Sequence, residues 1–461
     1  MHYKVSLVQF MSDSSLPDQK PAPRAALHTL GCRLNQAETE ALRRGLEIAG
    51  YRIVPWGEPA ELCVLNSCTV TAQADAKARQ ALRATRRAMP DARLALVGCY
   101  AQVTGEQLAA EGLADVVVGN QDKMRLPELL AETSAVPPEG SAPAPLVQVP
   151  SISRAPFEMA TDFDWGGDTR ASLKIQDGCD FMCSFCIIPT ARGRARPRKL
   201  DNLLEQARVM AQSGAREIVL TGVNLGTYDQ DGEGLLEVVD QLNRLEELAR
   251  IRISSIEPTT VDTGLIERMA DPSHRLVPFL HLPLQSGSDT ILQAMKRRYS
   301  VGEWRAFAEQ ALDQVPDLCL GSDVMAGFPG ENDEAFGETL SLLEALPLAY
   351  FHVFPFSSRS GTAAARLPGH TSGEVANRRV ATLRALSEEK RMAFHRRHTG
   401  TVRPVLFERP TNESTARGYT DNYLRVEVAH LQPGTLRNQL IPVQLLEASA
   451  HTLAGVLAEG H

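Results

Sequence analysis

The stretch "QDGCDFMCSFCIIPTARG", residues 176–193, places three cysteines within eight residues. Cys179, Cys183 and Cys186, called the loop triad below, have the spacing C-x3-C-x2-C and directly follow the apolar run 171–177. Thiolates this close together can ligate three irons of a [4Fe–4S] cubane, and three ligands leave the fourth iron open. A zinc site that takes a fourth ligand from elsewhere in the chain is the alternative.

Downstream of this loop, apolar runs alternate with amphipathic stretches. The strand-like runs lie at 171–177, 216–223, 250–258, 279–284, 318–327 and 350–357. The helical patterns lie at 201–213, 234–248, 261–270, 287–297, 301–314, 331–345 and 373–397. This alternation predicts parallel strands with right-handed crossovers. A complete barrel of eight β/α units needs about 250 residues, so this shorter series predicts a partial (β/α)6 barrel with its active face in the βα loops.

Upstream, three strand-like runs each end in a cysteine: "LGC" at Cys32, "NSC" at Cys68 and "VGC" at Cys99. Helical patterns between these runs predict a second α/β domain with a parallel sheet. Because the carboxyl ends of parallel strands share one edge, these cysteines, called the strand-end triad below, are expected to meet there. Helices that start nearby favour thiolates and an anionic cluster. Ordinary buried cysteines are the alternative, and core packing is the prediction for Cys63 and Cys319.

Composition divides the chain into four parts. Residues 25–133 are the predicted amino-terminal α/β domain, and 134–164, rich in Pro, Ser and Ala, are expected to be a linker. Residues 165–397 contain the barrel. Short β-like runs separated by turn residues predict a small all-β barrel of five strands in 398–461. The fold class is therefore α/β with an all-β carboxy-terminal domain, and residues 1–24 are expected to be a loose extension.

The bulk composition limits the environment. The formal net charge of −8 argues mildly against a nucleic-acid partner, although local basic patches can override the total. We find no signal peptide and no run of about 20 apolar residues, so we expect a cytoplasmic protein without a membrane partner. Thiols stay reduced there, so the eight cysteines indicate metal binding or catalysis before disulfides.

The loop triad at the head of a six-unit barrel resembles the radical S-adenosylmethionine (SAM) enzymes. Both triads together resemble the methylthiotransferases of that superfamily, over nearly the whole chain from about residue 25. The motifs that carry this resemblance are "TLGCRLNQAETE", "NSCTVTAQADAKARQ", "VGCYAQ", "LTGVNLGTY", "SSIEP", "HLPLQSGSDTILQAMKRRY" and "GSDVMAGFPGE". The carboxy-terminal "GTVRPVLFE" looks like the start of that family's RNA-binding TRAM domain.

The resemblance implies two [4Fe–4S] clusters and SAM as cofactors. The loop-triad cluster would bind SAM and cleave it to a radical, and the strand-end cluster would carry the sulfur to be transferred. The radical takes hydrogen from an unactivated carbon, and a methylthio group replaces that hydrogen. A reductant protein of the flavodoxin or ferredoxin kind and a sulfur donor are implied as partners, besides the substrate.

The same resemblance implies SAM contacts after the second and third barrel strands. Gly222 and Asn224 in "LTGVN" stand where the family holds the amino group of SAM. Glu257 in "SSIEP" is a candidate for polar contacts to SAM. For Glu257, the alternative is a carboxylate inside the barrel that is neutralised by a Lys or Arg.

Subfamilies of the methylthiotransferases differ in their targets. "TLGCRLNQAETE" is most similar to the group that modifies C2 of N6-threonylcarbamoyladenosine at position 37 of tRNA, with Arg33 where that group usually has Lys. Isopentenyladenosine of tRNA and an aspartate of a ribosomal protein are the alternative targets. A non-catalytic, metal-bound RNA-binding protein is the alternative of another class.

A basic run after the loop triad fits an RNA partner better than the total charge does. "TARGRARPRK" contains no acid and five cations, which are Arg192, Arg194, Arg196, Arg198 and Lys199. We predict that they contact substrate phosphates, the alternative being a solvated loop. In the tail, the candidates for one RNA-binding face are Arg403, Arg417, Arg425, Tyr419 and Tyr423.

Overall fold

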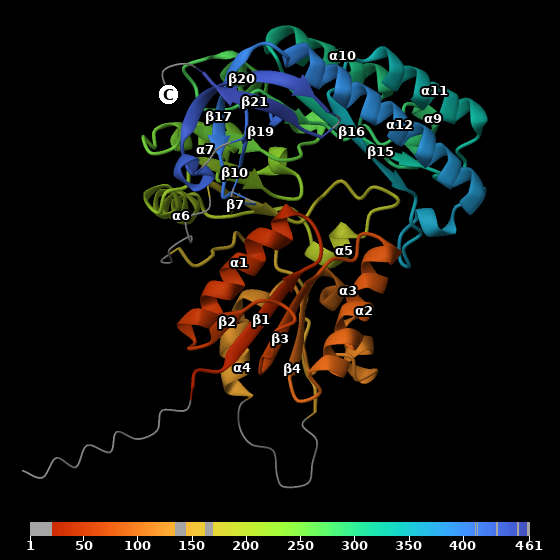
Figure 1. Ribbon diagram of the computed structural model, residues 1–461. Coiled ribbons are helices and arrows are strands. Elements are labelled where there is room, and N and C mark those ends of the chain that lie inside the picture. The colour runs from red at the N-terminus through yellow and green to blue at the C-terminus, as the bar shows by residue number, and fades with distance from the viewer. Residues whose placement is uncertain are drawn as a thin grey trace, which may run out of the picture.

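The computed structural model describes residues 21–133, 144–161, 169–410, 412, 414–429, 432–449 and 451–458. Figure 1 shows an amino-terminal sheet with its helices, a larger central layer of strands and helices, and a small barrel close to the carboxy terminus. Among the described residues, no helix is long and apolar enough to cross a membrane.

The amino-terminal domain is a sheet of six parallel strands in the order β2-β1-β3-β4-β5-β6. The strands are β1 (Arg24–Thr29), β2 (Arg52–Val54), β3 (Leu62–Ser67), β4 (Arg93–Gly98), β5 (Val116–Val118) and β6 (Leu146–Gln148). The helices are α1 (Arg33–Ile48), α2 (Ala72–Ala88), α3 (Cys99–Ala110) and α4 (Leu126–Glu132), with the 3₁₀ turn η1 (Lys123–Arg125). Strands β3 and β5 are buried along their whole length, as a parallel sheet covered on both faces requires.

Strand β6 lies inside the segment that the sequence predicts to be a linker. Leu146 and Val147 pack against the apolar clusters of the sheet, and β6 pairs with β5 as the edge strand. A three-residue strand has too short an alternation to be seen among prolines, so the composition of the segment concealed it. The expected linker residues 134–143 and 162–164 lie outside the described residues.

The central domain contains six parallel strands, which confirms the partial (β/α)6 barrel. The strands are β7 (Arg170–Lys174), β10 (Glu217–Thr221), β13 (Arg250–Ile253), β14 (Phe279–His281), β15 (Cys319–Ala326) and β16 (Tyr350–Pro355). They form two three-stranded sheets, β7-β10-β13 and β14-β15-β16, joined by parallel bridges between Ile251 and Leu276 and between Ser255 and His281. The helices that accompany these strands are α6 (Leu200–Gln212), α7 (Leu235–Asn243), α8 (Thr263–Ala270), α9 (Asp289–Ala294), α10 (Val301–Gln314), α11 (Asp333–Ala345) and α12 (Gly373–His398).

Short elements follow the first barrel strand and carry the chain back toward the amino-terminal domain. They are β8 (Gln176–Asp177), α5 (Ile188–Arg192) and β9 (Arg196–Pro197). In Figure 1, α5 lies between the barrel and helices of the amino-terminal domain. Helix α5 therefore packs against α3 of the amino-terminal domain.

The carboxy-terminal domain is a closed barrel in the order β17-β18-β19-β21-β20, which confirms the predicted small barrel of five strands. Its strands are β17 (Val402–Phe407), β18 (Thr415–Tyr419), β19 (Arg425–Ala429), β20 (Leu440–Ala448) and β21 (Leu453–Leu457). It packs against the starting ends of the central strands, where the Arg250 guanidinium donates to the backbone oxygens of Tyr419 and Pro404, both at 2.7 Å. Cys319 belongs to the shared apolar cluster, and Cys63 is buried in the amino-terminal sheet, as predicted for both.

Candidate cluster and substrate site

The loop triad lies between β8 and α5, after the first barrel strand. Gly178, just before Cys179, has a φ of 70°. A Cβ at this position would lie 1.9 Å from the backbone oxygen of Arg194, so the loop can close only around a glycine. The backbone N–H of Cys179 donates to the backbone oxygen of Gly193 at 3.1 Å and fixes the start of the loop.

Each sulfur of the loop triad has one N–H donor. The pairs are Phe181 N to Cys179 Sγ at 3.5 Å, Ile188 N to Cys186 Sγ at 3.4 Å, and Arg297 Nη1 to Cys183 Sγ at 3.2 Å. Burial acts against ionisation, because it raises the pKa of Cys186 to about 12 and also raises the pKa of Cys179 and Cys183. The free thiols therefore stay protonated at neutral pH, and a bound cation such as iron is needed to hold them as thiolates.

The strand-end triad meets at one edge of the amino-terminal sheet. Cys32 is the N-cap of α1, Cys99 is the first residue of α3, and Cys68 directly follows β3. A Cβ on Gly31 would lie 3.0 Å from Cys68 Cβ, so the first two cysteine segments touch. Burial raises the pKa of Cys68 to about 11, and Cys99 and Cys32 are close enough to raise this pKa by charge repulsion. The structure thus groups the six predicted cysteines into two sets of three.

The donor set of each triad fits a [4Fe–4S] cluster. In the part of the chain that the structure describes, no three His, Cys, Asp or Glu side chains are placed to hold one ion together. A cubane makes a different demand, because each of its irons takes its own thiolate, so the sulfurs stand apart. The amino termini of two helices at Cys32 and Cys99 add partial positive charge, which favours thiolates.

The predicted SAM contacts Gly222 and Asn224 follow the second barrel strand, β10. Asn224 is 1% exposed, and its Oδ1 accepts from Thr260 Oγ1 at 3.2 Å. Its Nδ2 has no hydrogen-bond partner among the described residues. Because buried amide groups are almost always hydrogen-bonded, this free donor suits a bound acceptor such as the carboxylate of SAM.

Glu257 follows the third barrel strand and forms an ion pair with Arg297. Burial raises the pKa of Glu257, and the positive charge of Arg297 opposes that shift. The structure therefore has the arrangement that the sequence left as the alternative, a carboxylate neutralised by an arginine. Arg297 also donates to Cys183 Sγ, and it is a site residue that the sequence reasoning missed. Its position in "QAMKRRY", inside a family motif, was the one signal for it.

A cavity of about 670 Å³ lies beside Gly222, one of the predicted SAM contacts. All three domains line it: Cys32 and Arg33 from the start of α1, Gly222 and Asp323 from the central barrel, and Tyr423 from the carboxy-terminal barrel. Pockets that hold small-molecule ligands commonly have this size. One space is thus bordered by a strand-end cysteine and by a predicted SAM contact.

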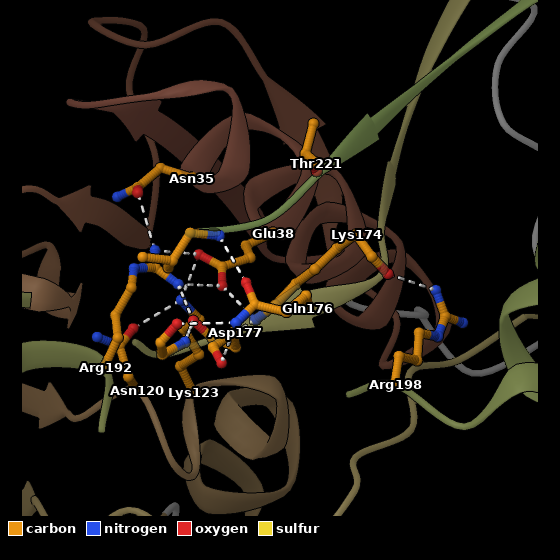
Figure 2. Close-up of polar contacts among 12 residues, drawn as sticks. Asn35, Glu38, Asn120, Lys123, Lys174, Gln176, Asp177, Arg192, Arg198 and Thr221 are labelled. Atoms are coloured by element: carbon orange, nitrogen blue, oxygen red, sulfur yellow. Dashed lines mark hydrogen bonds and ion pairs between the residues drawn. The ribbon is translucent and has the colours of Figure 1, made fainter. Parts of the chain in front are cut away.

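The predicted basic RNA contacts are mostly interior. Arg192, Arg196 and Arg198 are 1%, 6% and 0% exposed. Arg192 forms ion pairs with Glu38 and Asp177, as Figure 2 shows, and Arg196 lies 3.7 Å from Asp177. Arg198 donates to backbone and amide oxygens of the barrel. These guanidinium groups are occupied by the protein itself, which corrects the prediction that they contact phosphates.

The other two cations of the run remain at the surface. Arg194 pairs with Asp180 at 2.7 Å, and Lys199 pairs with Glu158 at 2.6 Å. Because the side chains of Arg194 and Lys199 are exposed, the prediction that these two residues contact RNA stays a prediction.

The tail residues predicted to form an RNA-binding face are partly committed to the domain interface. Tyr419 and Tyr423 stack on each other at 5.0 Å, and the guanidinium of Arg170 lies over the Tyr419 ring. Arg403 forms ion pairs with Asp317 and Asp421. The packing of the carboxy-terminal barrel on the central barrel accounts for both arrangements.

Residues 173–343 match the radical SAM superfamily, and residues 24–119 match the uncharacterized protein family UPF0004. The threonylcarbamoyladenosine tRNA methylthiotransferase MtaB of Bacillus subtilis (strain 168) is 36% identical over 431 residues, 92% of this chain and 94% of that protein. The chain therefore belongs to the radical SAM methylthiotransferase family. A tRNA-2-methylthio-N(6)-dimethylallyladenosine synthase of Cereibacter sphaeroides (strain ATCC 17025 / ATH 2.4.3) is 33% identical over 93% of this chain and 97% of its own length.

Among solved structures, the radical SAM methyltransferase TsrM from Kitasatospora setae has a TM-score of 0.52 and 14% sequence identity, over 72% of this chain and 73% of that one. This likeness concerns the fold alone. Membership of the methylthiotransferase family makes the chain a transferase, and it implies SAM and a [4Fe–4S] cluster as cofactors.

Proposed function

We propose that the protein transfers a methylthio group to C2 of N6-threonylcarbamoyladenosine at position 37 of tRNA. The observation that carries the proposal is the single cavity bordered by Gly222, beside the predicted SAM site, and by Cys32 of the strand-end triad. A nucleoside bound in this cavity would lie beside the SAM site at Gly222 and beside the sulfur-carrying cluster at Cys32. The relatives named for this reaction, from Bacillus subtilis and Aquifex aeolicus, align with 92% and 88% of the chain.

In this proposal the loop triad holds the cluster that binds SAM, and the strand-end triad holds a second [4Fe–4S] cluster. When bound, these groups supply a radical that removes hydrogen from an unactivated carbon, and the sulfur that takes its place. The chain positions them: Asn224 Nδ2 offers a donor to SAM, and Arg297 bridges Glu257 and Cys183.

The charge of the cavity supports an anionic substrate group. Its cationic lining consists of Arg33, Arg252, Arg391 and Arg425, against one carboxylate, Asp323. Arg252 is neutralised by Glu217 at 2.7 Å, and Asp323 lies 3.1 Å from His281. Within the described residues, Arg33 and Arg391 form no ion pair with a carboxylate. The threonylcarbamoyl group carries a carboxylate, whereas an isopentenyl group is apolar, so this lining favours the former.

Two alternative targets stay in the same family. One is isopentenyladenosine of tRNA, and the other is an aspartate of a ribosomal protein, which is also an anion. The proposal includes a flavodoxin-like or ferredoxin-like reductant and a sulfur donor as partners, because the reaction consumes electrons and sulfur. We place the reaction in the cytoplasm, where tRNA is found and where free thiols persist.

The test uses anaerobically reconstituted protein and three anticodon stem-loops that differ only at the target base. They carry N6-threonylcarbamoyladenosine, isopentenyladenosine or adenosine, and nucleoside mass spectrometry reads the product. We expect a methylthio product on the first. A faster reaction on isopentenyladenosine, or labelling of a ribosomal protein supplied in a parallel reaction, would contradict the proposed substrate.

A matched pair of variants sharpens this test. Arg391→Gln removes a cavity cation, and Arg384→Gln removes a cation of the same helix that does not line the cavity. A charge-assisted hydrogen bond contributes about 1.5–3 kcal/mol, so Arg391→Gln should raise KM for the threonylcarbamoyl stem-loop roughly tenfold or more. KM for the isopentenyl stem-loop, and both values in Arg384→Gln, should stay nearly unchanged.

A further inference from the structure

We propose that the buried ion network between the amino-terminal domain and the barrel is the counter-charge of the strand-end cluster and sets the reduction potential of that cluster. The inference rests on the proposed second cluster. It assigns a role to residues that neither the cysteine motifs nor the cavity explains.

The network consists of five ionised side chains that are almost fully buried. Its members are Glu38, Lys123, Lys174, Asp177 and Arg192, each 5% exposed or less. Lys174 Nζ lies 2.7 Å from Glu38 and 2.6 Å from Asp177, and Arg192 Nη1 lies 2.9 Å and 3.0 Å from the same carboxylates. Lys123 pairs with Glu38 as well. Figure 2 shows the five converging from both domains.

The charges of this network do not cancel. Three cations face two carboxylates, and the nearby Arg196, 3.7 Å from Asp177, adds further positive charge. Burial opposes the ionisation of Glu38, yet its three cationic neighbours hold the pKa of that carboxyl well below its usual range. The five side chains therefore carry a net charge of +1 in an interior site, where an uncompensated charge is strongly unfavourable.

Two side-chain amides connect this excess charge to the strand-end triad. Asn35 Oδ1 accepts from Arg192 Nη2 at 2.9 Å and from Cys32 Sγ at 3.3 Å. Asn120 Oδ1 accepts from Lys123 Nζ at 2.7 Å.

The other end of Asn120 reaches the third strand-end cysteine, since its Nδ2 lies 3.5 Å from Cys99 Sγ. A single side-chain amide therefore separates Cys32 from Arg192, and another separates Cys99 from Lys123. A cluster held by three thiolates at this edge would be anionic and would balance the charge.

The network also reaches the loop triad. Asp177 Oδ1 accepts from Gly178 N at 3.0 Å, immediately before Cys179, and Arg192 ends α5, which begins just after Cys186. Glu38 belongs to the amino-terminal domain, whereas Asp177 and Arg192 belong to the barrel. The same charges therefore position both cysteine segments relative to each other.

The test uses two substitutions of opposite sign in a Cys183→Ala background, which leaves only the strand-end cluster. Glu38→Gln makes the network more positive and should raise the midpoint potential, because positive charge favours the reduced, more negative cluster. Lys123→Met makes it less positive and should lower the potential. Electron paramagnetic resonance during a redox titration at pH 7 measures both shifts.

Two controls separate charge from structure. The double variant Glu38→Gln/Lys123→Met restores the original charge excess and should return the potential to that of the background protein. Arg194→Gln carries the same charge change as Lys123→Met, but at an exposed site, and should leave the potential unchanged. Shifts of the same sign in both single variants, or no shift in either, would overturn the inference.

A second measurement covers variants that fold poorly without a cluster. Cluster loading should raise the Tm of Glu38→Gln by more than that of the background protein, because the cluster neutralises a larger excess of positive charge. It should raise the Tm of Lys123→Met by less, because the excess is smaller. Equal rises in Tm would count against the inference. Iron analysis distinguishes failure of the second cluster from failure of the inference. Absence of iron in the Cys183→Ala background overturns the second cluster and the inference with it, whereas a cluster with unmoved potentials overturns the inference alone.

Discussion

The two cysteine triads provide the same three thiols by different routes. The loop triad comes from one short loop that closes around Gly178, where a side chain would strike the backbone of Arg194. The strand-end triad comes from three segments as far apart as Cys32 and Cys99, and it exists only because three parallel strands end at one edge. The first arrangement is local and can be read from spacing. The second depends on the topology of a whole domain.

The largest expected effect is loss of one cluster at a time. Reconstituted protein should contain about eight irons, and Cys183→Ala and Cys68→Ala should each contain about four. Because the triads lie in different domains, each cluster should assemble without the other. Iron analysis with electron paramagnetic resonance measures this, and loss of all iron from either variant would show that the triads do not assemble independently.

The glycines before the cysteines differ in what a side chain would meet. Gly178→Ala places a Cβ 1.9 Å from a backbone oxygen, and Gly98→Ala places one 2.5 Å from Asn66 Oδ1, both at positive φ. We expect each to lower the free energy of unfolding by about 3 kcal/mol or more, and to reduce iron only at its own triad.

A control glycine separates these effects from alanine substitution as such. A Cβ on Gly373, the first residue of α12, meets nothing within 4 Å. Gly373→Ala should therefore leave the free energy of unfolding unchanged or slightly higher. Chemical denaturation measures all three variants, and equal losses in all of them would contradict the role of the loop geometry.

The end of the barrel away from the triads contains a buried carboxylate that should make the stability of the protein depend on pH. Burial opposes ionisation of Glu217, but Arg252 and Arg170 lower the pKa of its carboxyl from 4.5 to about 2. A lowered pKa means that this stability is present above pH 4.5 and is lost as the pH falls toward 2, by about 3 kcal/mol in all. Between pH 4.5 and pH 2, the free energy of unfolding of cluster-free protein should fall more steeply with pH for the wild type than for Glu217→Gln. Chemical denaturation at several pH values measures this, and equal slopes would refute the assignment.

The smallest effect should come from the surface part of the basic run. Arg194 pairs with Asp180 at the surface, whereas Arg192 is fully enclosed by the ion network. Arg194→Ala should change the free energy of unfolding by less than about 1 kcal/mol. Arg192→Ala should lower it by about 3–5 kcal/mol, because it leaves two carboxylates with fewer partners. Similar values for the two variants would mean that the network contributes little.

Spacing and periodicity were enough to predict both triads, the six-stranded barrel and the carboxy-terminal barrel. They were not enough for the basic run, because the sequence shows that Arg192 and Arg198 are charged but not that the amino-terminal domain covers the first and the barrel itself covers the second. Glu38 illustrates the same limit, since a glutamate on a helix gives no sign that three cations from two domains surround it. Strand β6 was missed because three residues are too few for a recognisable alternation.

One anaerobic reaction tests the central claim, that the triads have separate tasks. Wild-type protein, Cys183→Ala and Cys68→Ala are each given SAM, a reductant and tRNA carrying N6-threonylcarbamoyladenosine, and 5′-deoxyadenosine and methylthio nucleoside are measured together. We predict both products from the wild type, neither from Cys183→Ala, and 5′-deoxyadenosine alone from Cys68→Ala. Methylthio nucleoside from Cys68→Ala, or 5′-deoxyadenosine from Cys183→Ala, would contradict this division of labour.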